Sequence, residues 1–180
     1  MMKLKVNLDV AAAKWKKAFP RMQSKIEQAA SCAFLNAKKP VAFKRRSFEI
    51  GVILTDDTNI KTLNKNYRGK NKPTNVLSFP QLNLQNFRRT SLDIFPVSSE
   101  IPLGDILLAF QTIQRECLEQ GKSLEDHVIH LITHGTLHLL GYDHMRQAEA
   151  KAMEKLECDI LESLGYPDPY HESPAKKLIH

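Results

Sequence analysis

Three histidines at fixed intervals are the residues of this chain best suited to chemistry. His134 and His138 are four residues apart, so on a helix they project side by side from one face. His144 follows six residues later and would point roughly 240° away from His138 if the helix continued. Gly141 lies between them, and glycine accepts the left-handed conformation that ends a helix. The spacing therefore predicts a helical pair, a break, and a third histidine that returns to the pair.

Three imidazoles in this arrangement are typical of a zinc site that keeps a fourth position open for water or substrate. We expect one zinc ion per chain on His134, His138 and His144, although nickel, copper and iron also accept imidazole. His130 lies one turn earlier on the same face, and a His130/His134 pair is geometrically possible too. Only the set that ends at His144 uses Gly141, so we expect His130 to neighbour the ligands.

The spacing of the histidines is also that of metzincin peptidases, with one departure. Those enzymes place a glutamate, their general base, directly after the first histidine. Here that position is Gly135, so a peptidase would need a base from outside the motif. Three neutral imidazoles leave the charge of zinc uncompensated, which favours an anionic substrate such as a phosphodiester. Asp143 either orients an imidazole or makes a local turn hydrogen bond.

A second cluster contains Arg68, Lys70 and Lys72, three cations within five residues. The planar guanidinium of Arg68 can bind two phosphate oxygens at once, although such cations also simply neutralise a helix C-terminus. The net charge of +6 divides into +14 for residues 1–92 and −8 for the remainder. This division suits a protein with one face for a polyanion, but an inert basic surface would have the same composition.

The hydrophobic pattern predicts the elements that position these residues. Strands are expected over 3–8, 48–54, 76–79 and 103–110. Helices are expected over 11–36 with a break at Pro20, from 56 to about 67, over 111–120, from a cap at Ser123 through the histidines, and over 147–164. This order indicates an α+β (α/β-like) domain, a small mixed sheet covered by helices, with a long polar connection over 81–102.

The 180 residues are expected to form one domain, with residues 1–45 the least distinctive part and 168–180 a frayed polar tail. No apolar run approaches the ~20 residues that span a bilayer. The N-terminus lacks the uninterrupted apolar region of a secretory signal. Three widely spaced cysteines without a C-x-x-C pair indicate reduced thiols, so we expect a cytoplasmic protein that does not associate with membranes.

Five segments taken together resemble the bacterial YbeY family: 54–57, 67–70, 74–80, 103–105 and 134–144. The resemblance implies a mixed, mostly parallel four-stranded sheet flanked by about five helices. It also implies a single-strand-specific, metal-dependent endoribonuclease that acts in 16S rRNA 3′-end maturation and ribosome quality control. The expected partners are single-stranded RNA, the 16S rRNA precursor and the small ribosomal subunit, with ribosome-assembly factors as further candidates.

By the same resemblance, His134, His138 and His144 are the zinc ligands, and Arg68 and His134 are the residues expected to serve catalysis. One departure is that the family often has aspartate where this chain has Asn71 or Asn75. The residues leave open whether water at the metal or the 2′-hydroxyl of the RNA attacks. A ribosome-assembly factor with a mainly structural zinc is the main alternative, and a metzincin-like peptidase is a weaker one.

Overall fold

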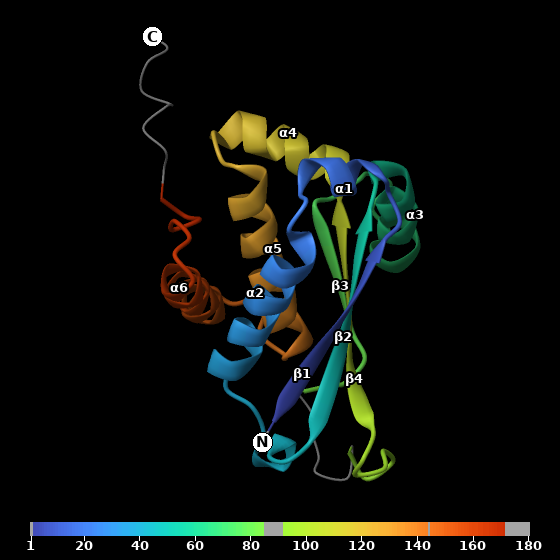
Figure 1. Ribbon diagram of the computed structural model, residues 1–180, viewed down its shortest axis with the longest axis vertical. Coiled ribbons are helices and arrows are strands. Elements are labelled where there is room, and N and C mark those ends of the chain that lie inside the picture. Colours follow the sequence, from blue (N-terminus) through green and yellow to red (C-terminus); the bar gives the residue numbers. More distant parts are fainter. Residues whose placement is uncertain (1, 85–91, 144, 172–180) are drawn as a thin grey trace.

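A four-stranded sheet with helices on both faces forms the body of the molecule (Figure 1), and the computed structural model describes residues 2–84, 92–143 and 145–171. The strand order is β1-β2-β4-β3, where the strands are β1 (Lys3–Val10), β2 (Ser47–Thr55), β3 (Val76–Pro80) and β4 (Glu100–Ala109). The pairs β1–β2 and β2–β4 are parallel, and β3 runs antiparallel to β4. The predicted mixed, mostly parallel sheet is therefore confirmed.

Six α-helices occur in the described ranges: α1 (Lys14–Ala18), α2 (Met22–Asn36), α3 (Asp57–Arg68), α4 (Phe110–Gln120), α5 (Leu124–Leu139) and α6 (Gln147–Ser163). A 3-10 turn, Val41–Phe43, precedes β2. The count exceeds the expected five because the segment predicted over 11–36 forms two helices, α1 and α2, on either side of the break expected at Pro20. Pro20 lies in the division, where its missing N–H and its ring disfavour a continuous helix.

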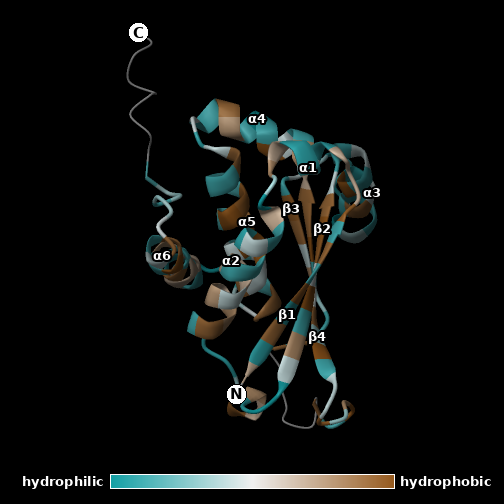
Figure 2. Ribbon diagram, viewed as in Figure 1, coloured by the Kyte–Doolittle hydropathy of each residue, from teal (hydrophilic) through white to brown (hydrophobic). Residues whose placement is uncertain are grey.

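The helices form layers around the sheet. Helices α2 and α5 pack against one face, α3 lies on the other, and α6 packs outside α2 and α5 (Figure 1). The main core lies between the sheet and the α2–α5 layer, and alternate residues of β2 point into it: Phe48, Ile50, Val52 and Leu54. Figure 2 shows the hydrophobic colouring along the upper halves of β2 and β3. A smaller cluster lies beneath α3: Ile60, Leu77, Leu107 and Ala109.

The ends of α3 follow the signals in the sequence. The side chain of Asp56 accepts a hydrogen bond from the backbone N–H of Asn59 at 2.9 Å, which caps the first turn. Gly69 ends the helix with a φ of 69°, in the left-handed region. Arg68 is consequently the last residue of α3, and the chain turns directly after it towards β3.

Strand β4 differs from its prediction at both ends. It begins at Glu100, which pairs with Ser47, and it ends at Ala109. Leu103, the predicted first residue, therefore lies within the strand, and Phe110 already belongs to α4. Glu100, Ile101 and Pro102 join the sheet because they pair in parallel with β2, and Ile101 is buried in the core.

Part of the predicted tail is held in place. The Pro169 carbonyl oxygen accepts a hydrogen bond from Lys122 Nζ at 2.7 Å, and the hydroxyl of Tyr170 donates to Glu157 of α6. Fraying therefore does not describe residues 168–171, because side chains of the folded body hold them. Residues 172–180 lie outside the described part of the chain.

Two further features of the described ranges concern the cysteines and the helices. Cys32, Cys117 and Cys158 are all free, as predicted. None of the described helices is both long enough and apolar enough to cross a membrane.

Candidate metal centre

Two histidines of α5 bring their ring nitrogens together. His134 Nε2 and His138 Nε2 are 3.0 Å apart, and the ring centroids are separated by 4.5 Å. This is the side-by-side placement that the four-residue spacing predicts for one face of a helix. Both side chains are only half-buried, so the pair lies at the surface of the core rather than within it.

The other nitrogen of each ring is engaged by an acceptor. His134 Nδ1 donates to the Glu157 Oε1 atom at 2.7 Å, and His138 Nδ1 donates to the Tyr142 carbonyl oxygen at 2.9 Å. A neutral imidazole has one N–H, and these acceptors place it on Nδ1 in both rings. Each Nε2 then presents its lone pair to the other, an arrangement that a shared proton or a metal ion can hold. The donor set therefore fits a metal bound by imidazole.

The chain leaves the helix where the sequence indicates. Helix α5 ends at Leu139, and Gly141 has a φ of 86°, in the left-handed region. The Tyr142 N–H returns to the Leu137 carbonyl at 3.1 Å, so the exit is closed by backbone hydrogen bonds. His144, the predicted third ligand, lies outside the described residues, and its role remains a prediction.

A groove of about 720 Å³ opens beside the paired histidines. Arg68, His134 and His138 all line it, together with residues in 74–78, 80–84, 141–143 and 145. Arg68 reaches the groove because the Tyr67 ring packs edge-on against Phe79 at 5.1 Å, which fixes the end of α3 against β3. Tertiary structure thus brings the predicted phosphate-binding arginine and two predicted ligands to one surface.

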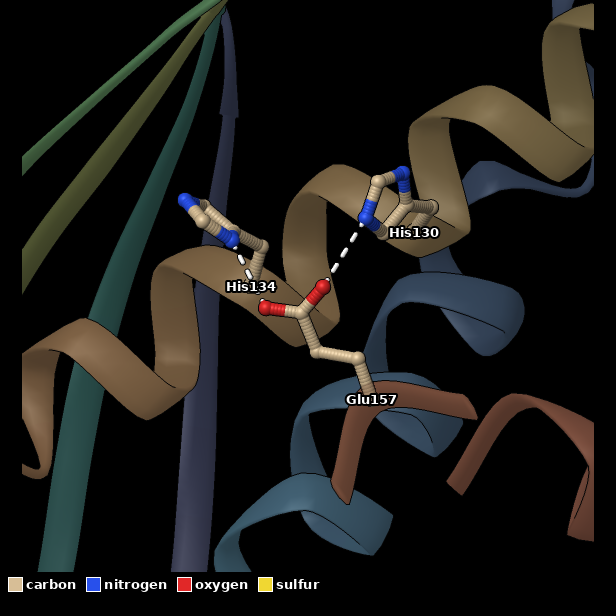
Figure 3. Close-up of side chains that lie close together, drawn as sticks. All are labelled: His130, His134 and Glu157. Carbon is tan, nitrogen blue, oxygen red and sulfur yellow. Dashed lines mark hydrogen bonds and ion pairs between the residues drawn. The ribbon is translucent and has the colours of Figure 1, made fainter. Parts of the chain in front are cut away.

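A second grouping of possible ligands lies behind the pair. The closest ligand atoms of His130, His134 and Glu157 all lie within 4.8 Å of one another, and Figure 3 shows Glu157 reaching from α6 to both rings. Burial alone would raise the pKa of Glu157, but hydrogen bonds from His130 and His134 outweigh it and lower the pKa to about 2. Burial lowers the pKa of His130, which favours its neutral form. Glu157 is therefore held in its ionised form beneath the paired histidines.

Gly135 occupies the position at which a metzincin has its catalytic glutamate, and here α5 meets the sheet. A Cβ atom added to Gly135 would lie 2.9 Å from Ile106 Cγ2 and 3.1 Å from Ser78 Oγ. A larger side chain would therefore require the side chains of Ile106 and Ser78 to shift. The absence of the peptidase base at this position thus has a packing reason.

The remaining histidines and Asp143 differ in burial and in whether they line the groove. His127 is buried and its Nε2 lies 2.7 Å from Glu116 Oε2, away from the groove lining. Asp143 lines the groove. His171 is exposed, and His180 lies beyond the described residues.

Sequence reasoning missed Glu157, which is completely buried on α6. A signal was present, since the buried residues of this helix are Met153, Glu157, Ile160 and Leu161. These positions form one apolar stripe, and a glutamate within such a stripe needs partners.

The fold and the groove define an α+β protein with a candidate histidine metal centre and an arginine on one open surface. The family model for Endoribonuclease YbeY matches residues 10–165, and the chain belongs to this family. This finding confirms the resemblance.

Curated relatives agree with this membership. Proteins named Endoribonuclease YbeY are 51% identical in Rhodopseudomonas palustris, over 68% of both chains, and 46% identical in Rhizobium etli, over 78% of this chain and 76% of the relative. A third, from Paramagnetospirillum magneticum, is 39% identical over 94% of this chain and 97% of its own.

A solved structure supports the fold. The solution structure of TM1509 from Thermotoga maritima covers 93% of this chain and 99% of its own, with a TM-score of 0.50 and 20% identity. At that identity the likeness concerns the fold alone.

Proposed function

We propose that this protein is a single-strand-specific, zinc-dependent endoribonuclease of the cytoplasm that acts in 16S rRNA 3′-end maturation and ribosome quality control. Its substrate would be the 16S rRNA precursor in the context of the small ribosomal subunit. The observation that carries the proposal is that Arg68, His134 and His138 line one groove, in a chain of the endoribonuclease YbeY family.

The proposed ligands are His134, His138 and His144. Zinc bound there would supply Lewis-acid polarisation of a phosphoryl oxygen and activation of water. The carboxylate of Glu157 and the carbonyl of Tyr142 keep the first two imidazoles oriented towards one another. These partners support a preorganised site, because neither ring has to turn when the ion binds.

Arg68 is the proposed phosphate-binding residue. Its guanidinium can donate two parallel hydrogen bonds to a phosphoryl group and so stabilise charge that develops there in the transition state. Lys70 and Lys72 follow it in the exposed turn before β3 and would hold the flanking RNA backbone. Together they would supply the cationic path that leads to the histidines.

The test is cleavage of a single-stranded RNA that spans a precursor 16S 3′ end. The wild-type protein is compared with Arg68→Ala and with Lys65→Ala, a matched loss of an exposed cation on α3 outside the groove lining. All three are brought to equal zinc content. We expect Arg68→Ala to lower the rate by about 10²–10³-fold, as loss of a transition-state donor does, and Lys65→Ala to leave it nearly unchanged.

A duplex of the same sequence is the substrate control and should resist cleavage. Equal cleavage by the wild type and Arg68→Ala would contradict the role of Arg68. RNA bound by every variant but cleaved by none would instead favour a ribosome-assembly factor with a mainly structural zinc.

A further inference from the structure

Glu157 is the only buried acidic side chain among the described residues, and its exposure is zero. A carboxylate removed from water is costly unless donors replace the lost hydration. Three donors surround it: His134 Nδ1 lies 2.7 Å from Oε1, His130 Nε2 lies 3.0 Å from Oε2, and the Tyr170 hydroxyl also donates to Oε2. Figure 3 shows the two oxygens directed at the two rings. Both oxygens of the carboxylate therefore accept hydrogen bonds. Oε1 accepts from the candidate ligand His134, and Oε2 accepts from His130 and Tyr170.

We propose that Glu157 is a positioning residue that holds the His134 imidazole in the tautomer and orientation needed for metal binding, and that His130 and Tyr170 hold Glu157 in place. The inference rests on the proposed function in one respect, because it takes His134 as a ligand.

The first argument concerns the ring of His134. An imidazole rotates between two nearly equivalent orientations about its last torsion, and each neutral ring has two tautomers. A carboxylate can only accept, so the bond to Oε1 selects the tautomer with hydrogen on Nδ1. Nε2 is then left to face His138 Nε2 across 3.0 Å. One hydrogen bond thus removes three of the four possible states of the ring.

The second argument separates positioning from ligation. A metal held by Glu157, His130 and His134 would sit between atoms that already lie at hydrogen-bonding distances, beneath a carboxylate with no exposure. No coordination position there would open to a substrate. By contrast, His134 and His138 both line the 720 Å³ groove. Glu157 therefore acts through His134 and does not face the substrate.

The third argument concerns the supports. His130 Nδ1 is buried without a hydrogen-bond partner among the described residues, so the bond from its Nε2 to Glu157 is what fixes this ring. The Tyr170 ring packs edge-on against His130, with centroids 5.5 Å apart. The Tyr170 N–H is fixed in turn by Asp168 Oδ1 at 2.9 Å. The segment after α6 thus closes over the second oxygen of Glu157 and couples this part of the chain to the metal centre.

The test measures zinc affinity by chelator competition for the wild type, Glu157→Gln, Tyr170→Phe and a control, Glu162→Gln. The control removes an exposed carboxylate from the same helix. Loss of such a supporting partner typically costs 10–100-fold in metal affinity, and we expect this range for Glu157→Gln. Tyr170→Phe, which removes one of three donors, should give a smaller loss in the same direction, and Glu162→Gln none.

A second readout needs no metal. In the metal-free protein, ¹⁵N chemical shifts report the tautomer of each imidazole, and we expect His134 to be protonated on Nδ1 in the wild type and mixed in Glu157→Gln. Optical spectra of the cobalt-substituted wild type and Glu157→Gln report the coordination number of the metal. We expect the same number in both proteins, because Glu157 is not a ligand. A change in that number would overturn positioning in favour of ligation.

The outcomes separate this inference from the proposed function. Unchanged zinc affinity and an unchanged His134 tautomer in Glu157→Gln would overturn the inference alone. Should Glu157→Gln fail to fold, Tyr170→Phe decides, since it leaves the carboxylate in place. Zinc affinity that survives His134→Ala would overturn the proposed ligand set instead.

Discussion

Histidine residues of the same helix differ in chemistry because their neighbours differ. His127 is buried and contacts Glu116, and half-buried His130 contacts Glu157. His134 meets Glu157 on one side and His138 on the other, so its two ring nitrogens face a carboxylate and a second imidazole. The spacing of these residues along the helix is similar, so the role of each is decided by what packs against it.

The pair of half-buried Glu116 and buried His127 gives a prediction about pH. Glu116 Oε2 accepts hydrogen bonds from His127 Nε2 at 2.7 Å and from Asn75 Nδ2 at 3.0 Å. Burial by itself would raise the pKa of Glu116, but these bonds outweigh it and hold the pKa below its usual value of 4.5. A carboxyl group whose pKa is lower in the folded state stabilises the protein above pH 4.5, and this contribution is lost as the pH falls through the folded pKa.

Glu116→Gln should therefore lose on the order of 1–2 kcal/mol of unfolding free energy near neutral pH. The gap to the wild type should close as the solution is acidified below pH 4.5. Urea titrations at a series of pH values measure it, with Glu119→Gln, an exposed site on the same helix, as the control. If the difference in unfolding free energy between the wild type and Glu116→Gln were the same at every pH, the ionised form of Glu116 would not be what stabilises the protein.

At the scale of elements, the end of α5 matters as much as the helix itself. The residue after Gly141 is Tyr142, whose carbonyl accepts the hydrogen bond of His138 Nδ1. The Tyr142 hydroxyl accepts from the Lys38 N–H at 2.9 Å, which anchors the exit to the segment that follows α2. The path of the chain out of the helix thus orients the second candidate ligand.

Two glycine substitutions separate this role from plain backbone strain. Gly141 and Gly165 follow α5 and α6, with φ of 86° and 80°, so alanine at either should cost about 1–2 kcal/mol. Only Gly141→Ala should also weaken zinc binding, because its Cβ would lie 3.0 Å from Leu84 Cβ and shift the Tyr142 carbonyl. Thermal unfolding and chelator competition on both variants measure the two effects. Equal zinc affinities would argue against orientation by this exit.

At the scale of the whole molecule, charge and shape act together. The basic half of the sequence supplies α3 and the turn after it, and the acidic half supplies α5 and α6. The groove lies where the two halves meet, since Arg68 and the histidines both line it. A polyanion drawn to the basic half is thereby brought to the candidate metal centre.

This arrangement predicts a specific salt dependence for RNA binding. Each phosphate contact to single-stranded RNA contributes about −0.7 to the slope of log K against log salt concentration, so Lys70→Gln should make the slope shallower by about that amount. Lys151→Gln, an exposed site on α6, is the matched control and should keep the slope. Anisotropy of labelled RNA, with zinc removed by a chelator to prevent cleavage, measures both. An equally shallower slope in Lys70→Gln and Lys151→Gln would mean that net charge alone attracts RNA.

Predictions from the sequence were accurate where neighbouring residues decide the structure. The helix expected from 56 to about 67, which is α3, and the exit at Gly141 both follow from local backbone preferences. They were less accurate where a partner decides, as for β4, which starts at Glu100 because β2 lies alongside it. Where a strand begins depends on the strand it pairs with, and the residues of the strand itself do not specify that partner.

The sequence by itself determined the spacing of His134 and His138 on one helical face and the break that follows them, because both depend on residues within a few positions. Only the tertiary structure decided that Arg68 shares their groove and that Glu157 lies beneath them. These contacts join residues far apart in the chain. Their energies come from burial and from hydrogen bonds that exist only once the helices have packed against the sheet.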